Sequence, residues 1–296
     1  MAPGTGTSVP SPTRVGVVGC GLMGSGIAEV AARAGLDIAV VEFDAAAAER
    51  GLARIESSLA TAVDRGKLAA DDRDAALAKI SVTHDSDALA DRELVIEAVV
   101  EDEAAKVGVF EMADKIVVSG DAVLASNTSS IPIMKLAMAT QRPESVVGLH
   151  FFNPVPVLKL VELVPSLLTS EATIDRSERF AIDVLGKQVI RSQDRAGFVV
   201  NALLIPYLLS AIRMLESGFA TAEDIDAGMV EGCAHPMGPL HLTDLIGLDT
   251  TMAVAESLYE EFKEPLYAPP PLLSRMVDAG LLGRKTGRGF YDYHRA

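Results

Sequence analysis

Apolar residues in the first two thirds of this chain gather in short runs, and helical patterns separate the runs. The runs that read as buried strands span residues 15–18, 38–41, 94–100, 122–125 and 146–149. Residues 45–65 and 106–116 place apolar side chains at helical spacing. Strands that alternate with helices predict a mostly parallel, doubly wound α/β sheet with helices on both faces.

Strand patterns disappear after residue 196, and helical patterns take over. Residues 198–217 predict a long buried helix that Pro206 should kink. Thr221 followed by Asp224 is typical of a helix N-cap. We therefore predict a disordered tail over residues 1–13, an α/β domain over 14–193 and an all-α domain over 194–296. The apolar helices of the last domain are hard to cover within one chain, so we expect a homodimer formed through it. The basic, glycine-rich segment 283–291 is expected to be a solvated terminal turn.

The composition and net charge of the chain limit the kinds of partner and the cellular compartment that we expect. The chain of 296 residues has a net charge of −15, which argues against a nucleic-acid partner. Cys20 and Cys233 allow at most one disulfide, so a reducing cytoplasm is expected. The longest apolar run, 198–212, contains Asn201 and Pro206 and is shorter than the roughly 20 residues of a membrane span. We predict a cytoplasmic protein with no membrane partner and no metal site.

A glycine motif follows the first predicted strand. Gly19-Cys20-Gly21-Leu22-Met23-Gly24 lies between that strand and a helical pattern, and Glu42 ends the next strand. In this setting the glycines allow a tight turn and a close approach of the backbone to a pyrophosphate at the helix N-terminus. A carboxylate at the end of the second strand accepts hydrogen bonds from ribose hydroxyls and repels a 2′-phosphate, so NAD is favoured over NADP. Asp44 lies close enough to share or take that role.

His150 lies in an apolar, strand-like setting, and Glu162 follows twelve residues later in another apolar stretch. An imidazole titrates near neutral pH, and a carboxylate can fix its tautomer, so the two residues can form an acid–base pair. A core histidine bonded to a backbone carbonyl is the alternative. The hydride carrier implied by the glycine motif favours the acid–base pair.

Four polar side chains follow directly on predicted strands, namely Glu101, Asn127, Ser129 and His150. In parallel sheets ligands bind beyond the carboxyl ends of the strands. These residues should therefore converge on one edge of the sheet.

Several blocks of the chain resemble the 3-hydroxyacyl-CoA dehydrogenase family, in particular its short, single-function bacterial members. The matching blocks are Gly19 to Gly24, Val95 to Glu101, Ser126 to Ser130, His150 to Pro154, Lys159 to Glu162, Gly197 to Asn201, His235 to Pro239, Gly247 to Thr250 and Gly287 to Tyr291. They cover nearly all of the chain after the tail. The resemblance implies NAD-dependent interconversion of short-chain (S)-3-hydroxyacyl-CoA and 3-ketoacyl-CoA.

The resemblance also implies roles for single residues. His150 would be the general acid and base, and Glu162 would orient it. Ser129 and Asn201 would hydrogen-bond the reacting oxygen or the thioester carbonyl. The residues implied near the nicotinamide and its ribose are Glu101, Lys106 and Asn127.

The implied coenzyme A contacts are less regular. Ser58 matches the family's serine on the second helix, while Arg65 stands where the family has lysine, with Lys67 nearby. Asn153 is assigned to the substrate with them. The family that the chain resembles often has arginine at the position of Ala202, so the substrate contacts are expected to differ there.

Two other functions fit parts of the pattern. A dehydrogenase of the same fold that acts on a free hydroxy acid or sugar acid would also keep the histidine, and a basic groove around Ser58, Arg65 and Lys67 would distinguish it. A non-enzymatic NAD-binding protein would tolerate loss of the acid–base pair. A lysine-dependent β-hydroxyacid dehydrogenase would need a lysine early in the helical domain, and none occurs between Lys187 and Lys263.

Overall fold

The computed structural model describes residues 11–294, which form two compact units divided between Asp194 and Arg195. The first ten residues of the predicted tail lie outside the described part of the chain. Thr13 donates its backbone N–H to Glu93 at 2.7 Å.

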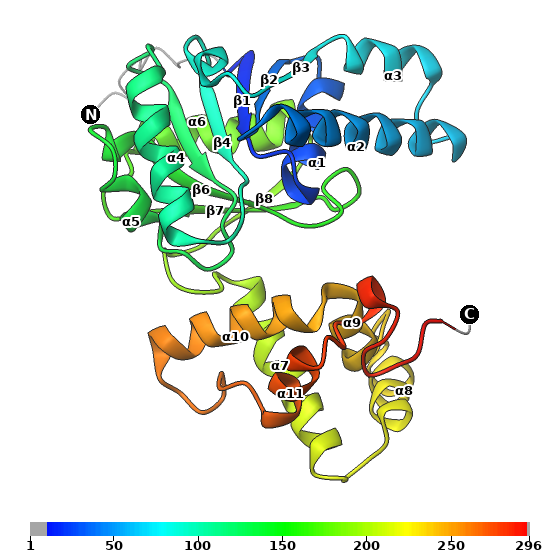
Figure 1. Cartoon of the computed structure of the whole chain (residues 1–296). Coiled ribbons are helices and arrows are strands. Elements are labelled where there is room, and N and C mark those ends of the chain that lie inside the picture. The colour runs from blue at the N-terminus through cyan, green and yellow to red at the C-terminus, as the bar shows by residue number, and fades with distance from the viewer. Residues whose placement is uncertain (1–10, 295–296) are drawn as a thin grey trace, which may run out of the picture. The chain divides into compact units, whose positions relative to one another are not determined.

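The first unit is built on a single eight-stranded sheet (Figure 1). Its strands are β1 (Arg14–Val18), β2 (Asp37–Val41), β3 (Ile80–Thr83), β4 (Leu94–Glu97), β5 (Val123–Ser126), β6 (Val146–Phe151), β7 (Leu160–Pro165) and β8 (Gln188–Arg191). They lie in the order β3-β2-β1-β4-β5-β6-β7-β8, and every neighbouring pair is parallel except β6 with β7. The predicted mostly parallel, doubly wound sheet is confirmed.

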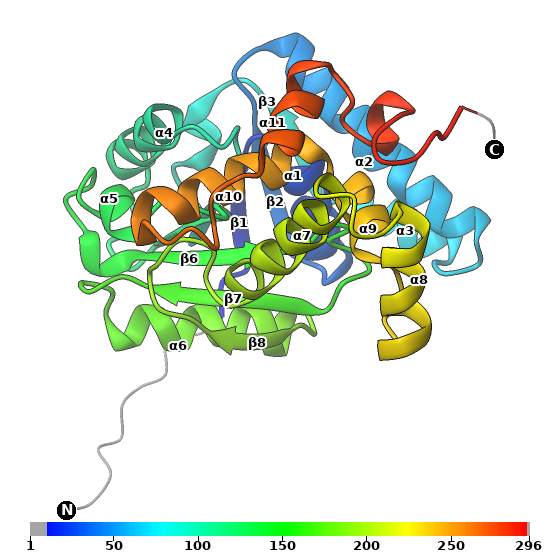
Figure 2. The ribbon, with the colours of Figure 1, turned by 90° about the horizontal axis from the view of Figure 1, so that it is seen from below.

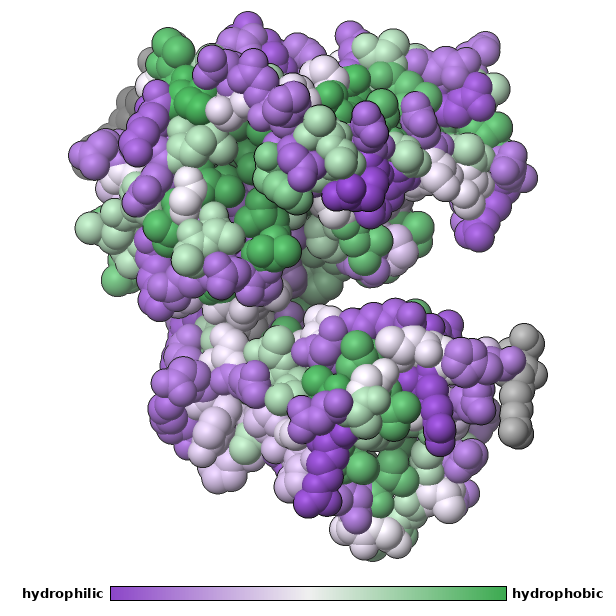
Figure 3. Space-filling view, viewed as in Figure 1, coloured by the Kyte–Doolittle hydropathy of each residue, from purple (hydrophilic) through white to green (hydrophobic). Residues whose placement is uncertain are grey.

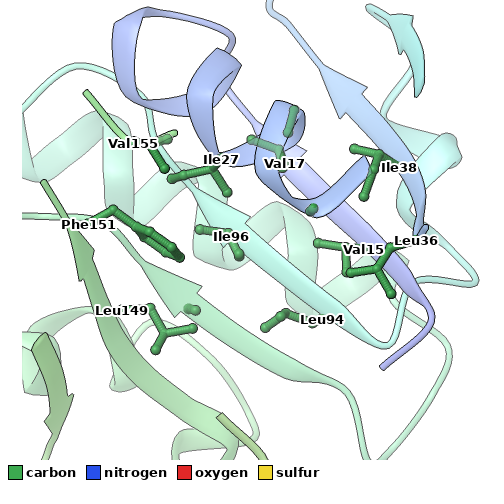
Figure 4. Close-up of a cluster of buried hydrophobic side chains, with 14 of the residues drawn as sticks. Val15, Val17, Ile27, Leu36, Ile38, Leu94, Ile96, Leu149, Phe151 and Val155 are labelled. Carbon is green, nitrogen blue, oxygen red and sulfur yellow. The ribbon is translucent and has the colours of Figure 1, made fainter. Parts of the chain in front are cut away.

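Helices flank this sheet. They are α1 (Leu22–Arg33), α2 (Ala45–Asp64), α3 (Ala70–Leu77), α4 (Glu103–Ile116), α5 (Ile133–Ala137) and α6 (Glu171–Arg179). Figure 2 shows β6, β7 and β8 side by side with α6 running along them. The core under α1 uses alternate strand positions, which share one face of a sheet. Figure 4 shows this arrangement, with Val15 and Val17 on β1 and Leu94 and Ile96 on β4 packed with Ile27 of α1.

Two differences between predicted and observed strand ends change where site residues lie. The strand expected over 94–100 ends at Glu97, so Glu101 follows it only after a three-residue segment. The strand expected over 146–149 continues to Phe151, so His150 lies inside it rather than after it. The reason for the second difference is the antiparallel partner β7, which hydrogen-bonds to β6 beyond the end of its parallel neighbour β5.

The second unit is all-helical, as predicted. Its helices are α7 (Val200–Glu216), α8 (Ala222–Cys233), α9 (Pro239–Ile246), α10 (Leu248–Phe262) and α11 (Pro271–Asp278). Thr221 is the N-cap of α8 and accepts a hydrogen bond from Asp224 N at 3.1 Å. No helix in the described part of the chain is long and apolar enough to cross a membrane.

The expectation of a solvated turn over 283–291 holds for the exposed residues 284–286 and fails at Phe290 and Tyr291. Asp244 is only 1% exposed and accepts hydrogen bonds from the backbone N–H groups of Phe290 and Tyr291, at 2.9 and 3.0 Å. The Tyr291 hydroxyl donates to Asp226 at 2.9 Å. Buried carboxylates need donors, and this segment supplies them. Local sequence could not reveal that requirement because the carboxylates lie more than forty residues upstream.

Candidate active site

The antiparallel pairing of β6 with β7 brings His150 and Glu162 together. The two residues are opposite each other in the register, so their side chains leave the same face of the sheet. His150 Nδ1 lies 2.7 Å from Glu162 Oε2. Glu162 is fully buried, and His150 is 7% exposed. The side chain of Phe152 packs against the imidazole at 4.6 Å between ring centroids.

This geometry sets the chemistry that the histidine can perform. A carboxylate that accepts the Nδ1–H hydrogen bond leaves the lone pair on Nε2, and it stabilises the imidazolium that forms when Nε2 takes a proton. The pair can therefore accept a proton from a hydroxyl group and return it.

Glu101 organises the turn that follows β5. Its Oε1 accepts hydrogen bonds from the backbone N–H groups of Ser129 and Ser130, at 2.9 and 3.1 Å, and from the Thr128 hydroxyl at 2.6 Å. The hydroxyls of Ser129 and Ser130 also donate to it. Burial alone would raise the pKa of Glu101, but the positive charge of Lys106 and these hydrogen bonds outweigh it and hold that pKa below its usual value. Glu101 is therefore an ionised anchor for the serine turn.

Lys106 lies at the centre of a buried charge network. Its Nζ lies 2.6 Å from Glu97 Oε1 and 3.2 Å from Glu101 Oε2, and its side chain is 1% exposed. Glu97 also accepts a hydrogen bond from the Ser126 hydroxyl at 2.6 Å. Sequence reasoning missed Glu97, although a carboxylate inside the apolar run of β4 was a usable signal. Asn127, next in the chain, is buried and accepts a hydrogen bond from Phe151 N at 2.9 Å.

The glycine motif forms the turn between β1 and α1. Gly19 has φ of +91°, and a Cβ at Gly24 would lie 1.9 Å from the Gly19 carbonyl oxygen, so both positions require glycine. A Cβ at Gly21, the N-cap of α1, would meet nothing within 4 Å, so the backbone there is open to a close ligand. Leu22 is exposed, while Met23 is half-buried. These features fit the pyrophosphate of a dinucleotide.

The two acids after β2 have different environments. Glu42 Oε1 accepts a hydrogen bond from Cys20 N, inside the glycine loop, at 2.5 Å. Asp44 is the N-cap of α2 and accepts from Ala47 N at 2.6 Å. Asp44 therefore already caps a helix, whereas Glu42 belongs to the dinucleotide loop.

A groove of about 940 Å³ lies along α2. Its charged lining is mostly basic and comprises Arg33, Arg50, Arg54, Arg65, Lys67 and a single acid, Glu29. Ser58 also lines the groove, and its hydroxyl group donates a hydrogen bond of 2.6 Å to Glu29. Pro154, which follows the exposed Asn153, lines the same groove. Figure 3 shows strongly hydrophilic side chains gathered over this part of the first unit.

The residues of this groove that the sequence predicted are Ser58, Arg65 and Lys67. Three arginines in its lining were not predicted, namely Arg33, Arg50 and Arg54. Arg50 and Arg54 are spaced four residues apart in register with Ser58, so they share one face of α2. That spacing was the available signal. Asn201 lies in the second unit, in the first turn of α7, and so on a different unit from the other predicted site residues.

Comparisons with known proteins agree over nearly the whole chain. Residues 14–195 match the family model of the 3-hydroxyacyl-CoA dehydrogenase NAD binding domain, and residues 197–293 match that of the C-terminal domain. A 3-hydroxybutyryl-CoA dehydrogenase of Mycobacterium tuberculosis is 62% identical over 280 residues, which cover 95% of this chain and 98% of the relative.

Two solved structures are also similar. The crystal structure of M. tuberculosis FadB2 has a TM-score of 0.95 and 62% identity, with 96% of this chain and 100% of that chain covered. The (S)-3-hydroxybutyryl-CoA dehydrogenase from Ralstonia eutropha has a TM-score of 0.90 and 46% identity, with 96% and 99% covered.

Proposed function

The chain belongs to the 3-hydroxyacyl-CoA dehydrogenase family, and we propose that it uses the His150–Glu162 pair to interconvert (S)-3-hydroxybutyryl-CoA and acetoacetyl-CoA. The protein is an NAD-dependent oxidoreductase that acts on 3-hydroxyacyl-CoA. The observation that carries the proposed mechanism is the 2.7 Å contact between Nδ1 of a nearly buried histidine and a fully buried carboxylate.

In the oxidation, His150 Nε2 takes the proton of the substrate 3-hydroxyl group. Glu162 stabilises the imidazolium that results, and its burial keeps water from screening that interaction. NAD, which the loop from Gly19 to Gly24 and Glu42 would hold, would supply the acceptor for the hydride of C3. In the reduction, the protonated His150 returns the proton to the oxygen. Ser129 and Asn201 are the proposed donors to the reacting oxygen or to the thioester carbonyl, where negative charge develops. The Ser129 hydroxyl, which donates to Glu101 at 3.2 Å, would turn toward the substrate for this role.

The proposed NAD site is formed by the loop Gly19 to Gly24 and by Glu42. The loop includes Gly21, Leu22 and Met23. The carboxylate of Glu42 would bind the adenosine ribose and repel the extra phosphate of NADP. Glu101, Lys106 and Asn127 are proposed to position the nicotinamide end, because the network of Lys106 and Glu101 holds the turn after β5.

The proposed substrate site is the groove along α2, with Ser58, Arg65 and Lys67 in its lining. Asn153 is proposed to join them, because it directly precedes the lining residue Pro154. Coenzyme A carries phosphates, and five basic side chains face one acid there. This charge favours an acyl-CoA over a free hydroxy acid or sugar acid, which would leave the groove without a function. A non-enzymatic NAD-binding role would in turn leave the buried acid–base pair unexplained.

The proposal also includes a homodimer and a cytoplasmic location. We place the dimer contact in the helical second unit, where side chains such as Leu203 and Phe219 are 72% and 79% exposed. We place the protein in the cytoplasm, because Cys20 and Cys233 are both free thiols and a reducing compartment maintains thiols.

The test is steady-state oxidation of NADH with acetoacetyl-CoA, beside free acetoacetate and with NADPH as the alternative donor. Turnover with the thioester and NADH alone is expected. His150→Gln should lower turnover by about 10²-fold or more, the usual contribution of a positioned acid–base group. Turnover of free acids alone would remove the acyl-CoA assignment, and full activity of His150→Gln would remove the mechanism.

A further inference from the structure

We propose that Arg54 couples the acyl-CoA groove to the dinucleotide loop, so that a coenzyme A phosphate bound in the groove strengthens NADH binding. This inference rests on the proposed function, in which the groove holds coenzyme A and the glycine loop holds NAD. Arg54 would be a positioning residue, because it would bind a phosphate of coenzyme A in the groove and thereby affect NADH at the glycine loop.

Arg54 touches both places. It lies on α2 and lines the groove, and its Nη1 donates a hydrogen bond of 2.6 Å to the Cys20 carbonyl oxygen. Cys20 is the residue between Gly19 and Gly21, and its N–H donates to Glu42 Oε1 at 2.5 Å. The backbone of the loop is therefore held from two sides, by the carboxylate after β2 and by the guanidinium from α2.

A second contact ties the same helix to the same loop residue. The Cys20 side chain is 1% exposed, and a Cβ at Gly51 would lie 2.6 Å from Cys20 Cβ. Gly51 precedes Arg54 by three residues, so α2 packs against Cys20 at one turn and hydrogen-bonds to it at the next. Because packed interiors do not compress, a change at this face of α2 reaches the loop backbone.

The guanidinium suits this double role. It presents five N–H donors in a fixed plane, so one N–H can bind the Cys20 carbonyl while others bind a phosphate. A phosphate on the outer N–H groups immobilises the side chain and polarises the bond to the carbonyl, which holds the loop in its dinucleotide-binding shape. Coupling of this kind is reciprocal, so NADH must raise the affinity for coenzyme A by the same factor.

The experiment measures NADH affinity by its fluorescence, with and without saturating free coenzyme A, which does not react. In the wild type we expect coenzyme A to tighten NADH binding by about fivefold, within the usual range of coupling between two sites. In Arg54→Ala the ratio of the two affinities should fall to about one. Arg50→Ala is the matched control, since Arg50 lies one turn earlier on the same face and lines the same groove. It should bind coenzyme A more weakly but keep the ratio.

Arg54→Lys separates charge from geometry. It keeps a positive charge in the groove, but one ammonium group cannot serve the carbonyl and a phosphate together as the planar guanidinium does. We expect it to retain most of the coenzyme A affinity and to lose the coupling. It also keeps the inference testable if Arg54→Ala does not fold, which the thermal melting of each variant reports.

The possible failures are distinguishable. If coenzyme A leaves NADH affinity unchanged in the wild type, or if Arg54→Ala or Arg54→Lys keeps the full ratio, the inference is overturned while the proposed function stands. If neither Arg54→Ala nor Arg50→Ala weakens coenzyme A binding, the groove does not hold coenzyme A, and the proposed substrate site is overturned as well.

Discussion

Replacing Glu162 by glutamine removes a charge from the proposed acid–base pair and leaves its shape almost unchanged. The carboxylate lies 2.7 Å from His150 Nδ1, and the glutamate side chain is fully buried. The amide oxygen of glutamine can still accept the Nδ1–H hydrogen bond. The main loss is therefore the attraction between the carboxylate and the imidazolium that forms during the reaction.

The size of this loss follows from the burial of the pair. Two unit charges about 4 Å apart attract by about 4 kcal/mol at an effective dielectric constant of about 20. If about half of the positive charge has developed on the imidazole in the transition state, the variant loses about 2 kcal/mol, or roughly 30-fold in rate. Full charge development sets an upper limit of about 10³-fold.

The assay is a single-turnover measurement of NADH consumption at saturating acetoacetyl-CoA, so that product release does not hide the chemical step. NADH affinity is measured beside it and should not change, because the contacts of the glycine loop do not involve Glu162. The double variant His150→Gln/Glu162→Gln should be no slower than His150→Gln alone, because a carboxylate that acts through the histidine contributes nothing without it.

Two results would refute this reasoning. A Glu162→Gln enzyme with the wild-type rate would show that the carboxylate does not support a charged His150. Rate losses that simply multiply in the double variant would show that Glu162 acts independently of His150.

Glu42→Ala should weaken NADH binding by about tenfold, since a charged hydrogen-bond acceptor is lost. Asp44→Ala should leave NADH affinity unchanged and lower the free energy of unfolding by about 1 kcal/mol, because a helix cap is lost. The opposite pattern in a fluorescence titration of NADH would assign the ribose to Asp44. Glu101→Gln should reduce stability most above about pH 4.5, because the folded-state pKa of Glu101 is lowered, and the difference from the wild type should shrink as the pH falls through that lower value. Urea midpoints at several pH values measure it, and a constant difference would contradict it. Burial, followed by the charge of Glu42, raises the pKa of the Cys20 thiol to about 11. At pH 8 a thiol reagent should therefore label the exposed Cys233 quickly and Cys20 only on unfolding. Fast labelling of both cysteines in the folded protein would contradict this prediction.

Much of the first unit could be predicted because its signals are local. A buried strand, a glycine turn and an amphipathic helix each depend on neighbouring residues, so β1, α1 and the loop from Gly19 to Gly24 were readable as one motif. The second unit was readable for the same reason, since its helices show their spacing and the N-cap at Thr221 directly.

Pairing between distant segments was harder to predict. The antiparallel addition of β7 extends β6 through His150, and the pattern of residues 146–149 contains no trace of that partner. Likewise, Glu97 and Asp244 lie in apolar sequence, and only the fold shows which donors satisfy them. A buried carboxylate requires partners, but the chain does not state which distant segment provides them.

The sequence by itself determined the fold class, the dinucleotide motif and the two residues His150 and Glu162, because chemical type and local periodicity are properties of the chain. Only the tertiary structure decided that the histidine and the glutamate face each other across β6 and β7, and that Arg54 joins the basic groove to Cys20. Those contacts depend on the register between strands and on the packing of α2 against the loop. Both result from burial summed over the whole unit, which no single stretch of sequence records.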